Sequence, residues 1–534
     1  MRNLRVAFGQ TNPVVGDFKH NLAQIEMVIA EVSDSADLVV FGELAICGYP
    51  LGDLSYRSDI IDATEAALEE LVGFSKKHPN LTVVVGHVSH ASRSSSTGQE
   101  SFAIAHNSAS AISNGTVLGT YHKQLLPNFD VFDDWRNFVP GSGELLFEVA
   151  GVQCAIAICQ DIWVEDSPRP QALKDLGVQL LVVPNGSPFE QGKRARRIKA
   201  ARDFQAGFGI AYANLSGGQD ELVFDGGSFL LDESGVLAFH AGSGEGAHQA
   251  TGEPVVETEE ELLWNTLVVG LRDYLAKTGQ KSVVLGLSGG IDSALSAAIA
   301  ADAVGPQNVY GVALPSRYSS QHSLEDARAL ANNLGINFSL VEIDSAHKAF
   351  EQLIKLGDLA GENIQARIRA VILMGISNTE GHLLLSTGNK SEIAVGYSTM
   401  YGDSAGGFAP IKDLYKTEVW TLSKWLNDSR GRELIPWNSI NKPPSAELRP
   451  GQLDQDSLPD YALLDRVIKL LVEKSMTVSE VASTGIERET VEAIDAMIRK
   501  AEWKRSQGAI GTKVSAVAFG SGRRVPLTTR FEKL

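Results

Sequence analysis

Short apolar runs recur along the first half of the chain, separated by stretches with the spacing of amphipathic helices. The runs LRVAFGQ, DLVVFGEL, LTVVVGHV, QCAIAIC and QLLVVPNG have the length and composition of buried strands. Residues 20–32 and 62–78 are helix-like, and residues 209–239 contain several short runs joined by glycine turns. This pattern predicts a layered α/β sandwich.

A second series of apolar runs begins after residue 280 and alternates with helix-like segments. The runs are KSVVLGL, NVYGVALP, NFSLVEID and HLLLSTGN, and their alternation is typical of a doubly wound parallel sheet. Residues 242–261 lack apolar periodicity and are rich in Gly and Glu. We therefore predict a first domain over residues 1–245, a linker over 246–261 and a second domain over 262–534. We also predict a long, functional loop over 439–461.

Composition narrows the classes of function. The 534 residues exceed the roughly 250–300 at which a single core stops growing. Lys and Arg number 47 against 65 Asp and Glu, and the net charge of −18 disfavours nucleic acid and anionic lipid as partners. Three cysteines are too few for a disulfide framework and lack the spacing of a zinc site. With neither a signal peptide nor a long apolar run, the chain is expected to be cytoplasmic and to have no membrane partner.

Three reactive side chains each follow a predicted strand of the first domain. Cys159 follows CAIAI, Glu43 comes just after LVVF, and Lys123 follows GTVLGTYH. Taken singly, Cys159 is equally consistent with a buried inert thiol, and we interpret Cys154 in that way. Taken singly, Glu43 and Lys123 are more typical of solvated surface charges. Together they supply what a thiol needs to attack a carboxamide: a base for its proton and a cation for the oxyanion.

Three segments resemble the signatures of the nitrilase (carbon–nitrogen hydrolase) family, in that family's order. They are GEL around Glu43, YHKQLLPN around Lys123 and CQDIW around Cys159. The resemblance implies an αββα nitrilase-like sandwich in which Cys159 is the nucleophile, Glu43 the general base and Lys123 the oxyanion stabiliser. Such a site cleaves an amide through a thioester.

The segment NGSPFEQGK resembles the glutamine-specific branch of this family. That resemblance implies that Ser187 and Lys193 bind glutamine. Phe129 stands in the same binding region where the branch often has tyrosine, which removes a hydroxyl contact. Asp134 stands where an additional glutamate is common, which shortens that carboxylate by one methylene.

The segment SGGIDS, residues 288–293, lies between a predicted strand and a helix of small residues. Glycines let backbone amides approach an anion, and a helix N-terminus favours phosphate. A structural alternative is that Asp292 or Ser293 only caps the helix. The segment lacks the lysine of a Walker A loop and resembles the pyrophosphate loop of enzymes that split ATP between its α and β phosphates. That resemblance implies that Asp292 contacts Mg²⁺, which suits a carboxylate with phosphate oxygens.

More distant segments narrow the family further. LPSRYSSQHSLEDARALANNLGI, ENIQARIR, STGNKSEIAVGYSTMYGDSAGGFAPIKDLYK and KPPSAELRPGQLDQDSLPDY resemble, in order, the signatures of the NAD synthetase family. The second domain is thus expected to be a doubly wound parallel-sheet ATP-pyrophosphatase domain. With the first half, and with EWKRSQ and FGSGRRVPL near the end, nearly the whole chain is similar to the glutamine-dependent NAD synthetase family in its shorter bacterial form.

This resemblance implies three groups of binding residues in the second domain. ATP would be bound by Gly286, Leu287, Ser288, Gly289, Gly290, Ile291, Asp292, Ser293, Ser316 and Thr387. Deamido-NAD would be contacted by Asn363, Glu392, Asp403, Lys416 and Lys504, and Mg²⁺ by Asp292 and Glu392. Each basic residue in or beside the matching segments is, taken singly, more typical of a solvated surface position, but together they would suit a ligand with several phosphates: Arg317, Arg367, Lys390, Lys412, Lys416, Lys442 and Lys504. Residues 442–445 are expected to belong to a lid that excludes water from the reaction.

The leading hypothesis is a two-site amidotransferase. Cys159 would release ammonia from L-glutamine, and ATP with Mg²⁺ would activate the carboxylate of deamido-NAD as an adenylate, which ammonia converts to NAD⁺. One alternative keeps this logic but changes the acceptor to another carboxylate or nucleotide. Another alternative is an amidase with a degenerate, regulatory nucleotide-binding domain. The resemblance also implies a homo-oligomer built on a synthetase dimer.

Overall fold

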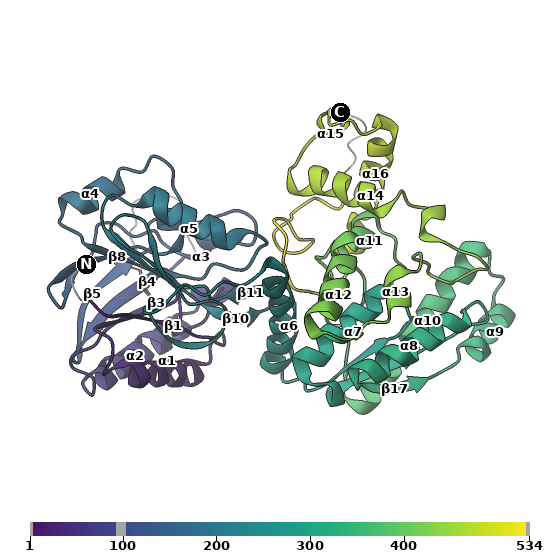
Figure 1. Ribbon diagram of the computed structural model, residues 1–534, viewed down its shortest axis with the longest axis horizontal. Coiled ribbons are helices and arrows are strands. Elements are labelled where there is room, and N and C mark those ends of the chain that lie inside the picture. Colours follow the sequence, from purple (N-terminus) through teal and green to yellow (C-terminus); the bar gives the residue numbers. More distant parts are fainter. Residues whose placement is uncertain (1–3, 92–102, 530–534) are drawn as a thin grey trace. The chain divides into compact units, whose positions relative to one another are not determined.

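The computed structural model describes residues 4–91 and 103–529 and divides into two compact units, Met1–Leu262 and Leu263–Leu534. Figure 1 shows a first unit built mainly of strands, in purple to teal, and a second unit rich in helices, in green to yellow. The residue limits of the two domains and of the linker stay a prediction.

The first unit contains two six-stranded sheets. The first has the order β14-β1-β2-β3-β4-β5, with β1 (Val6–Gln10), β2 (Leu38–Phe41), β3 (Thr82–His90), β4 (Ala105–Ser113), β5 (Thr116–His122) and β14 (Gly246–Gln249). The second has the order β13-β12-β9-β8-β7-β6, with β6 (Leu146–Val149), β7 (Val152–Ile156), β8 (Leu180–Asn185), β9 (Gly209–Asn214), β12 (Phe229–Leu231) and β13 (Leu237–His240). A hairpin of β10 (Ser216–Gln219) and β11 (Leu222–Asp225) completes the strands.

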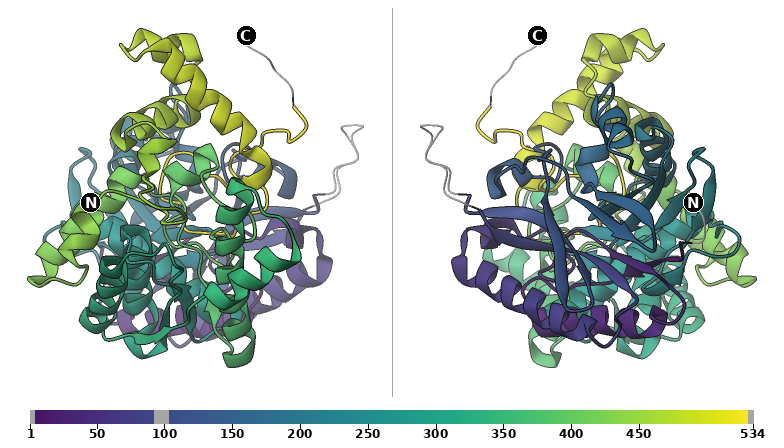
Figure 2. Two further views of the ribbon diagram at one scale, coloured as in Figure 1. Left: turned by 90° about the vertical axis from the view of Figure 1, so that its right-hand side faces the viewer. Right: turned by 90° about the vertical axis from the view of Figure 1, so that its left-hand side faces the viewer.

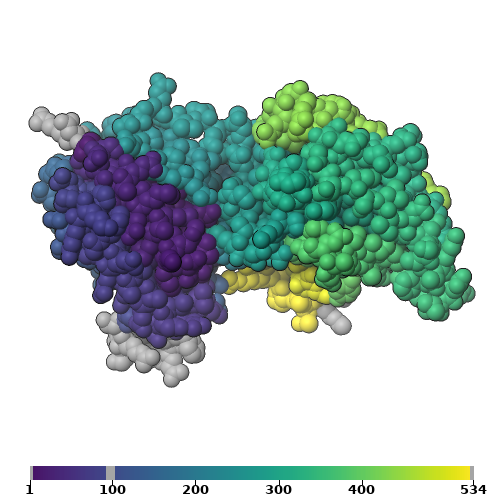
Figure 3. Space-filling model, turned by 90° about the horizontal axis from the view of Figure 1, so that it is seen from below, coloured from purple at the N-terminus to yellow at the C-terminus, as the bar shows by residue number. Residues whose placement is uncertain are grey.

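Helices cover both outer faces, which confirms the predicted αββα sandwich. Figures 1 and 2 show α1 (Phe18–Val32) and α2 (Ser58–Ser75) on one side of the sheets and α4 (Arg169–Asp175) and α5 (Lys193–Phe204) on the other. Figure 3 shows the outer surface of the α1 and α2 layer from below.

The alternation of side chains along β2 explains the layers. Val39 and Phe41 pack in the core with residues of α1 and α2, whereas Leu38 and Val40 pack in the core between the two sheets. Successive side chains of a strand point to opposite faces. A strand buried on both faces is therefore apolar throughout, as predicted.

One strand lies inside the stretch placed in the linker. β14 pairs antiparallel with β1, with Ala7 opposite Gln249 and Gln10 opposite Gly246. The segment GAHQ carries no apolar alternation, so its sequence does not indicate a strand. It pairs with the side of β1 that would otherwise be an open edge of the sheet.

The second unit is built on a four-stranded parallel sheet with the order β17-β16-β15-β18, formed by β15 (Val283–Gly286), β16 (Val309–Ala313), β17 (Asn337–Leu340) and β18 (Leu383–Leu384). The chain runs outward from β15 to β17 and returns to the other side of β15, so right-handed crossovers place helices on both faces. The predicted doubly wound sheet is confirmed.

The helices of the second unit fall into two groups. Those before and around the sheet are α6 (Glu259–Thr278), α7 (Ile291–Val304), α8 (Gln321–Leu334), α9 (Asp344–Leu353), α10 (Asp358–Glu380), α11 (Lys390–Val395), α12 (Lys416–Arg430) and α13 (Trp437–Asn441). Those near the end of the chain are α14 (Tyr461–Ile468), α15 (Val478–Ser483), α16 (Arg488–Lys500) and α17 (Glu502–Arg505). The predicted loop is irregular from residue 442 to 460 except for a 3₁₀ turn, Asp454–Asp456.

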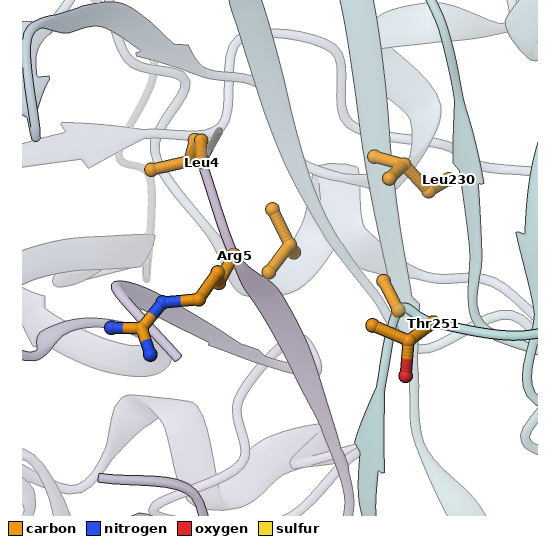
Figure 4. A pocket seen from close by; sticks show the side chains of 6 residues that line it. Leu4, Arg5, Leu230 and Thr251 are labelled. Atoms are coloured by element: carbon orange, nitrogen blue, oxygen red, sulfur yellow. The ribbon is translucent and has the colours of Figure 1, made fainter. Parts of the chain in front are cut away.

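A pocket of about 500 Å³ opens in the first unit, away from the predicted reactive residues. It is lined by Leu4, Arg5, Val6, Leu230, Ala250 and Thr251. Figure 4 shows the Arg5 side chain directed away from Leu230 and Thr251, and its guanidinium pairs with Asp37 at 2.7 Å. Over the described ranges, 4–91 and 103–529, none of the helices is long and apolar enough to span a membrane.

The short helix α3 (Asp134–Asn137) follows the last strand of the first sheet and carries Asp134. In β3, Gly86 lies very close to the backbone of residues 42–44. A Cβ atom on Gly86, in β3, would lie 2.4 Å from the nitrogen of Leu44 and 2.5 Å from the carbonyl oxygen of Gly42. Only glycine therefore lets the backbone around Glu43 cross β3 at this distance.

We expect Gly86→Ala to lower the free energy of unfolding by about 1–3 kcal/mol, because the added methyl group overlaps backbone atoms that cannot rotate away. Urea unfolding monitored by circular dichroism measures the change. Gly73→Ala is the matched control, since nothing lies within 4 Å of a Cβ atom there and alanine is the better helix former. An unchanged midpoint for Gly86→Ala would contradict the close approach.

Candidate active site

The structure brings Glu43 and Lys123 into direct contact. Nζ of Lys123 donates hydrogen bonds of 2.6 Å to Oε1 of Glu43 and 2.6 Å to Oδ2 of Asp134. Glu43 follows β2 and Lys123 follows β5, so strands of one sheet carry both residues to the same end. Burial alone lowers the pKa of an ammonium group, but Asp134 and Glu43 outweigh it, and the pKa of Lys123 lies well above its usual value.

Two further groups hold the Glu43 carboxylate. The side-chain amide of Asn107 donates to Oε1 at 2.7 Å, and the backbone N–H of Gly186 donates to Oε2 at 2.8 Å. Glu43 is 1 % exposed. A carboxylate with three donors in a buried site has a fixed orientation, which a residue that takes a proton from a neighbouring thiol requires.

Cys159 begins the 3₁₀ turn Cys159–Ile162 immediately after β7 and has a backbone φ of +44°. This left-handed conformation is strained for a residue with a side chain. Burial and the charge of Glu43 raise the pKa of the Cys159 thiol to about 12, while Lys123 acts in the opposite direction. The thiol is therefore neutral near pH 7, and attack requires a base that removes its proton.

Asp161 holds the turn that carries Cys159. Its Oδ2 accepts from the backbone N–H of Ile158 at 2.9 Å and from the hydroxyl of Tyr121 at 2.8 Å, and its Oδ1 accepts from the N–H of Leu125 at 2.9 Å. The only signal in the sequence for this role of Asp161 is its position two residues after Cys159, inside CQDIW.

Asp134 reaches Lys123 although its side chain is one methylene shorter than glutamate. Its second oxygen accepts a hydrogen bond from the Tyr49 hydroxyl at 3.2 Å. Burial raises the pKa of Asp134, and the positive charge of Lys123 opposes that rise. Asp134 is thus held by Tyr49 and provides a second carboxylate partner for the lysine beside Glu43.

The residues predicted to bind glutamine lie in different surroundings. Phe129 is 56 % exposed, and its ring lies edge-on to Phe132 at 5.6 Å between centroids. Nζ of Lys193 lies 5.6 Å from the centroid of Phe132, and its positive charge lowers the pKa of Cys159. Ser187 is buried, and its Oγ accepts from Nε of Arg197 at 3.1 Å.

The second group of predicted residues begins at the loop between β15 and α7. A Cβ atom on Gly289 would lie 2.2 Å from the carbonyl oxygen of Ser323, and the φ of Gly289 is +75°. Ser316 follows β16 and Thr387 follows β18, the two strands that flank β15. These residues therefore gather at the carboxyl edge of the sheet, where doubly wound folds bind ligands.

Asp292 and Glu392 share one buried ammonium group. Lys416 is 2 % exposed; its Nζ pairs with Oδ2 of Asp292 and, at 3.2 Å, with Oε1 of Glu392. Asn389 links the Asp292 carboxylate to the backbone of Glu392, because its Nδ2 donates to Oδ1 of Asp292 at 2.9 Å and its Oδ1 accepts from the backbone N–H of Glu392 at 3.0 Å.

Two carboxylates at this edge fit a cation that also takes phosphate oxygens. Burial raises the pKa of Glu392 to about 8; Lys416 opposes the rise and the charge of Asp292 adds to it. A cation at this point would relieve the repulsion between the carboxylates. In the described part of the chain, no group of three or more His, Cys, Asp or Glu side chains is arranged to hold a metal.

Asn363, Asp403 and Lys504 meet around one loop of residues 396–403. Thr399 donates through its hydroxyl to Oδ1 of Asn363 at 2.8 Å and through its N–H to Oδ1 of Asp403 at 2.6 Å. Nζ of Lys504 donates to the carbonyl oxygens of Gly396 and Ser398 at 2.8 and 2.7 Å. Burial raises the pKa of Asp403, and Lys504 opposes that rise.

One of the basic residues in the matching segments is buried in the protein. Lys390 is fully buried, and its Nζ pairs with Asp413 at 3.0 Å and Glu473 at 2.9 Å. Its charge is neutralised by these two carboxylates. The burial of Lys390 comes from the tertiary fold and is not visible in the sequence.

Comparisons with known proteins match both units. The carbon-nitrogen hydrolase family model matches residues 5–251, and the NAD synthase family model matches residues 263–508. The fold and the two sites thus define an enzyme in which a carbon–nitrogen hydrolase unit is joined to a synthase unit.

Relatives match over the full length. The glutamine-dependent NAD(+) synthetase of Thermotoga maritima is 39 % identical over 100 % of both chains, and that of Synechocystis sp. is 41 % identical over 98 % of this chain and 99 % of its own. The structure of the Acinetobacter baumannii glutamine-dependent NAD+ synthetase in complex with ADP covers 98 % of both chains with a TM-score of 0.75 and 35 % identity. The chain belongs to the glutamine-dependent NAD(+) synthetase family.

The thiol pKa near 12 predicts how alkylation depends on pH. We expect the rate of Cys159 modification by iodoacetamide in the folded protein to rise about tenfold per pH unit from pH 7 to 10, because the thiolate fraction rises by that factor below the pKa. Mass spectrometry in a Cys154→Ala background measures modification of Cys159 alone on its peptide. A rate that stops rising below pH 9 would show that the pKa of the Cys159 thiol is not raised as its burial predicts.

Proposed function

We propose that this protein makes NAD⁺ from deamido-NAD with nitrogen taken from L-glutamine. The first unit hydrolyses glutamine to glutamate and ammonia, and the second uses ATP to activate the acceptor carboxylate. The observation that carries the proposal is the full-length similarity to glutamine-dependent NAD(+) synthetases, and the geometry of the two sites supports it.

In the first reaction, Sγ of Cys159 attacks the carboxamide carbon of glutamine while Glu43 takes the thiol proton. The ammonium group of Lys123 stabilises the negative charge that develops on the carboxamide oxygen. Collapse of the tetrahedral intermediate expels ammonia, with the proton returned by Glu43, and leaves a thioester. Water activated by the same Glu43 then releases glutamate.

Ser187, Lys193 and Phe129 would hold the glutamine. Lys193 acts electrostatically on Cys159, so its charge is placed to attract the α-carboxylate of an amino acid bound beside that thiol. Ser187 is a buried polar residue that can contact the same group. Phe129 would cover the substrate with its ring, without the hydroxyl that a tyrosine would offer.

In the second reaction, the loop of residues 286–293 and the N-terminus of the 14-residue helix α7 would bind the phosphates of ATP. Ser316 and Thr387 would complete the ATP site from the neighbouring strands. Asp292 and Glu392 would hold Mg²⁺, which supplies charge neutralisation for the phosphates when bound.

Deamido-NAD would lie against Asn363, Glu392, Asp403, Lys416 and Lys504. Its carboxylate displaces pyrophosphate from ATP to form an adenylate, and ammonia displaces AMP to give the amide. Activation is necessary because an ionised carboxylate is a poor electrophile. Residues 442–445 would form part of a lid that keeps water from the adenylate.

The wider organisation is part of the same proposal. Residues 1–245 would form the glutaminase domain and residues 262–534 the synthetase domain, joined by a linker at 246–261 that includes β14. The chain would act in the cytoplasm as a homo-oligomer built on a dimeric synthetase core.

Cys159→Ala should reduce glutamine-dependent NAD⁺ formation by at least about 10³-fold, because the nucleophile of the first reaction is lost. Formation of NAD⁺ from ammonium chloride should stay within about twofold of the unmodified protein. Both rates are measured by NAD⁺ release with deamido-NAD and Mg·ATP. Cys154→Ala is the matched control, a buried cysteine of the same strand region, and should keep glutamine use. Loss of both activities in Cys159→Ala would contradict two separable sites.

A further inference from the structure

Arg197 on α5 is hydrogen-bonded to the turn that carries Ser187. Its Nε donates to Oγ of Ser187 at 3.1 Å, and its Nη2 donates to the carbonyl oxygens of Ser187 and Pro188 at 2.7 and 3.0 Å. Arg197 is 1 % exposed. These charge-assisted bonds form away from water and therefore fix the position of the turn.

The direction of these bonds decides what Ser187 can offer to a ligand. An arginine side chain only donates hydrogen bonds. Because Nε of Arg197 already donates to Oγ of Ser187, the hydroxyl hydrogen has to point away from Arg197. The backbone N–H of Ser187 is also occupied, since it donates to Oδ1 of Asn214 at 2.9 Å. The hydroxyl is thus oriented as a donor away from Arg197. The hydroxyl of Tyr212 is one neighbour within its reach, and the α-carboxylate of a bound glutamine would be another.

Arg197 is the first member of a chain of alternating charges. Its Nη1 pairs with Oδ1 of Asp225 at 2.8 Å, Oδ2 of Asp225 pairs with Nε of Arg194 at 2.8 Å, and Nη1 of Arg194 pairs with Oε2 of Glu257 at 2.6 Å. Two cations face two anions, so the group is neutral and its burial is tolerated. Removing the charge of any one of these four residues leaves a neighbouring buried charge without one of its ion-pair partners.

The far end of the chain lies outside the glutamine site. Glu257 is in the stretch 246–261 that we assign to the linker. Its Oε2 also accepts from the backbone N–H of Ser243 at 2.8 Å, and Oγ of Ser243 accepts from Nη2 of Arg194 at 2.8 Å. Glu257 is therefore held to the glutaminase domain by contacts that depend on Arg194.

We propose that Arg197 is a positioning residue for glutamine, that it acts through the hydroxyl of Ser187, and that Asp225 and Arg194 tie its position to Glu257 in the linker. The inference rests on the proposed function, because it names glutamine as the ligand. Movement of Glu257 releases Arg194 and loosens the hold of Asp225 on Arg197. Glutamine affinity in this protein consequently depends on the linker.

The first test measures KM and kcat for glutamine in the full-length protein, from glutamate released in the presence of deamido-NAD and Mg·ATP. Arg197→Lys keeps the charge but loses the planar fork. We expect it to raise KM about tenfold with kcat within about twofold, as loss of one charge-assisted hydrogen bond predicts. The double variant Ser187→Ala/Arg197→Lys should have the KM of Ser187→Ala alone. Additive increases, or a fall in kcat at unchanged KM, would overturn the inference.

The second test leaves the buried arginine in place, so it remains informative if Arg197→Lys does not fold. Glu257→Gln should raise KM for glutamine about threefold without changing kcat. Glu253→Gln, at an exposed glutamate of the same stretch, is the matched control and should keep the original KM. Equal KM values for the two variants would overturn the link to Glu257.

Ammonium chloride separates failure of this inference from failure of the proposed function. If the unmodified protein forms NAD⁺ from neither glutamine nor ammonium chloride, the proposed function and this inference both fall. If it uses glutamine, and Arg197→Lys and Glu257→Gln both keep its KM, only the positioning role falls.

Discussion

A buried ammonium group shared by two carboxylates is the interaction around which both sites are built. Lys123 lies between Glu43 and Asp134, and Lys416 pairs with Asp292 and Glu392. Ions out of contact with water are stable only when they are fully paired. Each lysine therefore holds its carboxylates in place. In the first site Glu43 is the base, and in the second Asp292 and Glu392 are the oxygen donors that suit a cation.

The two folds explain how these charges can be buried at all. Parallel strands end at one edge of a sheet, so residues that follow different strands meet there without a long loop. In the first unit the backbone around Glu43 packs so closely against β3 that only glycine fits at position 86. Cys159 adopts a left-handed backbone conformation, and Asp161 holds the turn that carries it. Packing of both sheet faces provides the rigidity that this geometry requires.

The sequence allowed the layers and the reactive residues to be predicted, because apolar runs locate strands and the functional residues follow their ends. Cys159 lies where that rule places it. The residues that hold the catalytic side chains in place could not be predicted in the same way. Asp161 is one of many acidic residues in the sequence, and only the fold shows that the backbone N–H groups of Ile158 and Leu125 donate to it. Lys390 is one of several basic residues in the matching segments, and only the tertiary fold shows that it is buried and paired with Asp413. The strand β14 exists because it pairs with β1, and its own composition does not indicate a strand.

The most direct test of the central claim follows one nitrogen atom from the first site to the second. Deamido-NAD and Mg·ATP are supplied with glutamine labelled with ¹⁵N in its amide and with no ammonium salt, and the NAD⁺ is analysed by mass spectrometry. The account predicts ¹⁵N in the carboxamide of NAD⁺, because the ammonia released at Cys159 is the nitrogen that the adenylate accepts. Unlabelled NAD⁺ from an enzyme that still hydrolyses glutamine would contradict it.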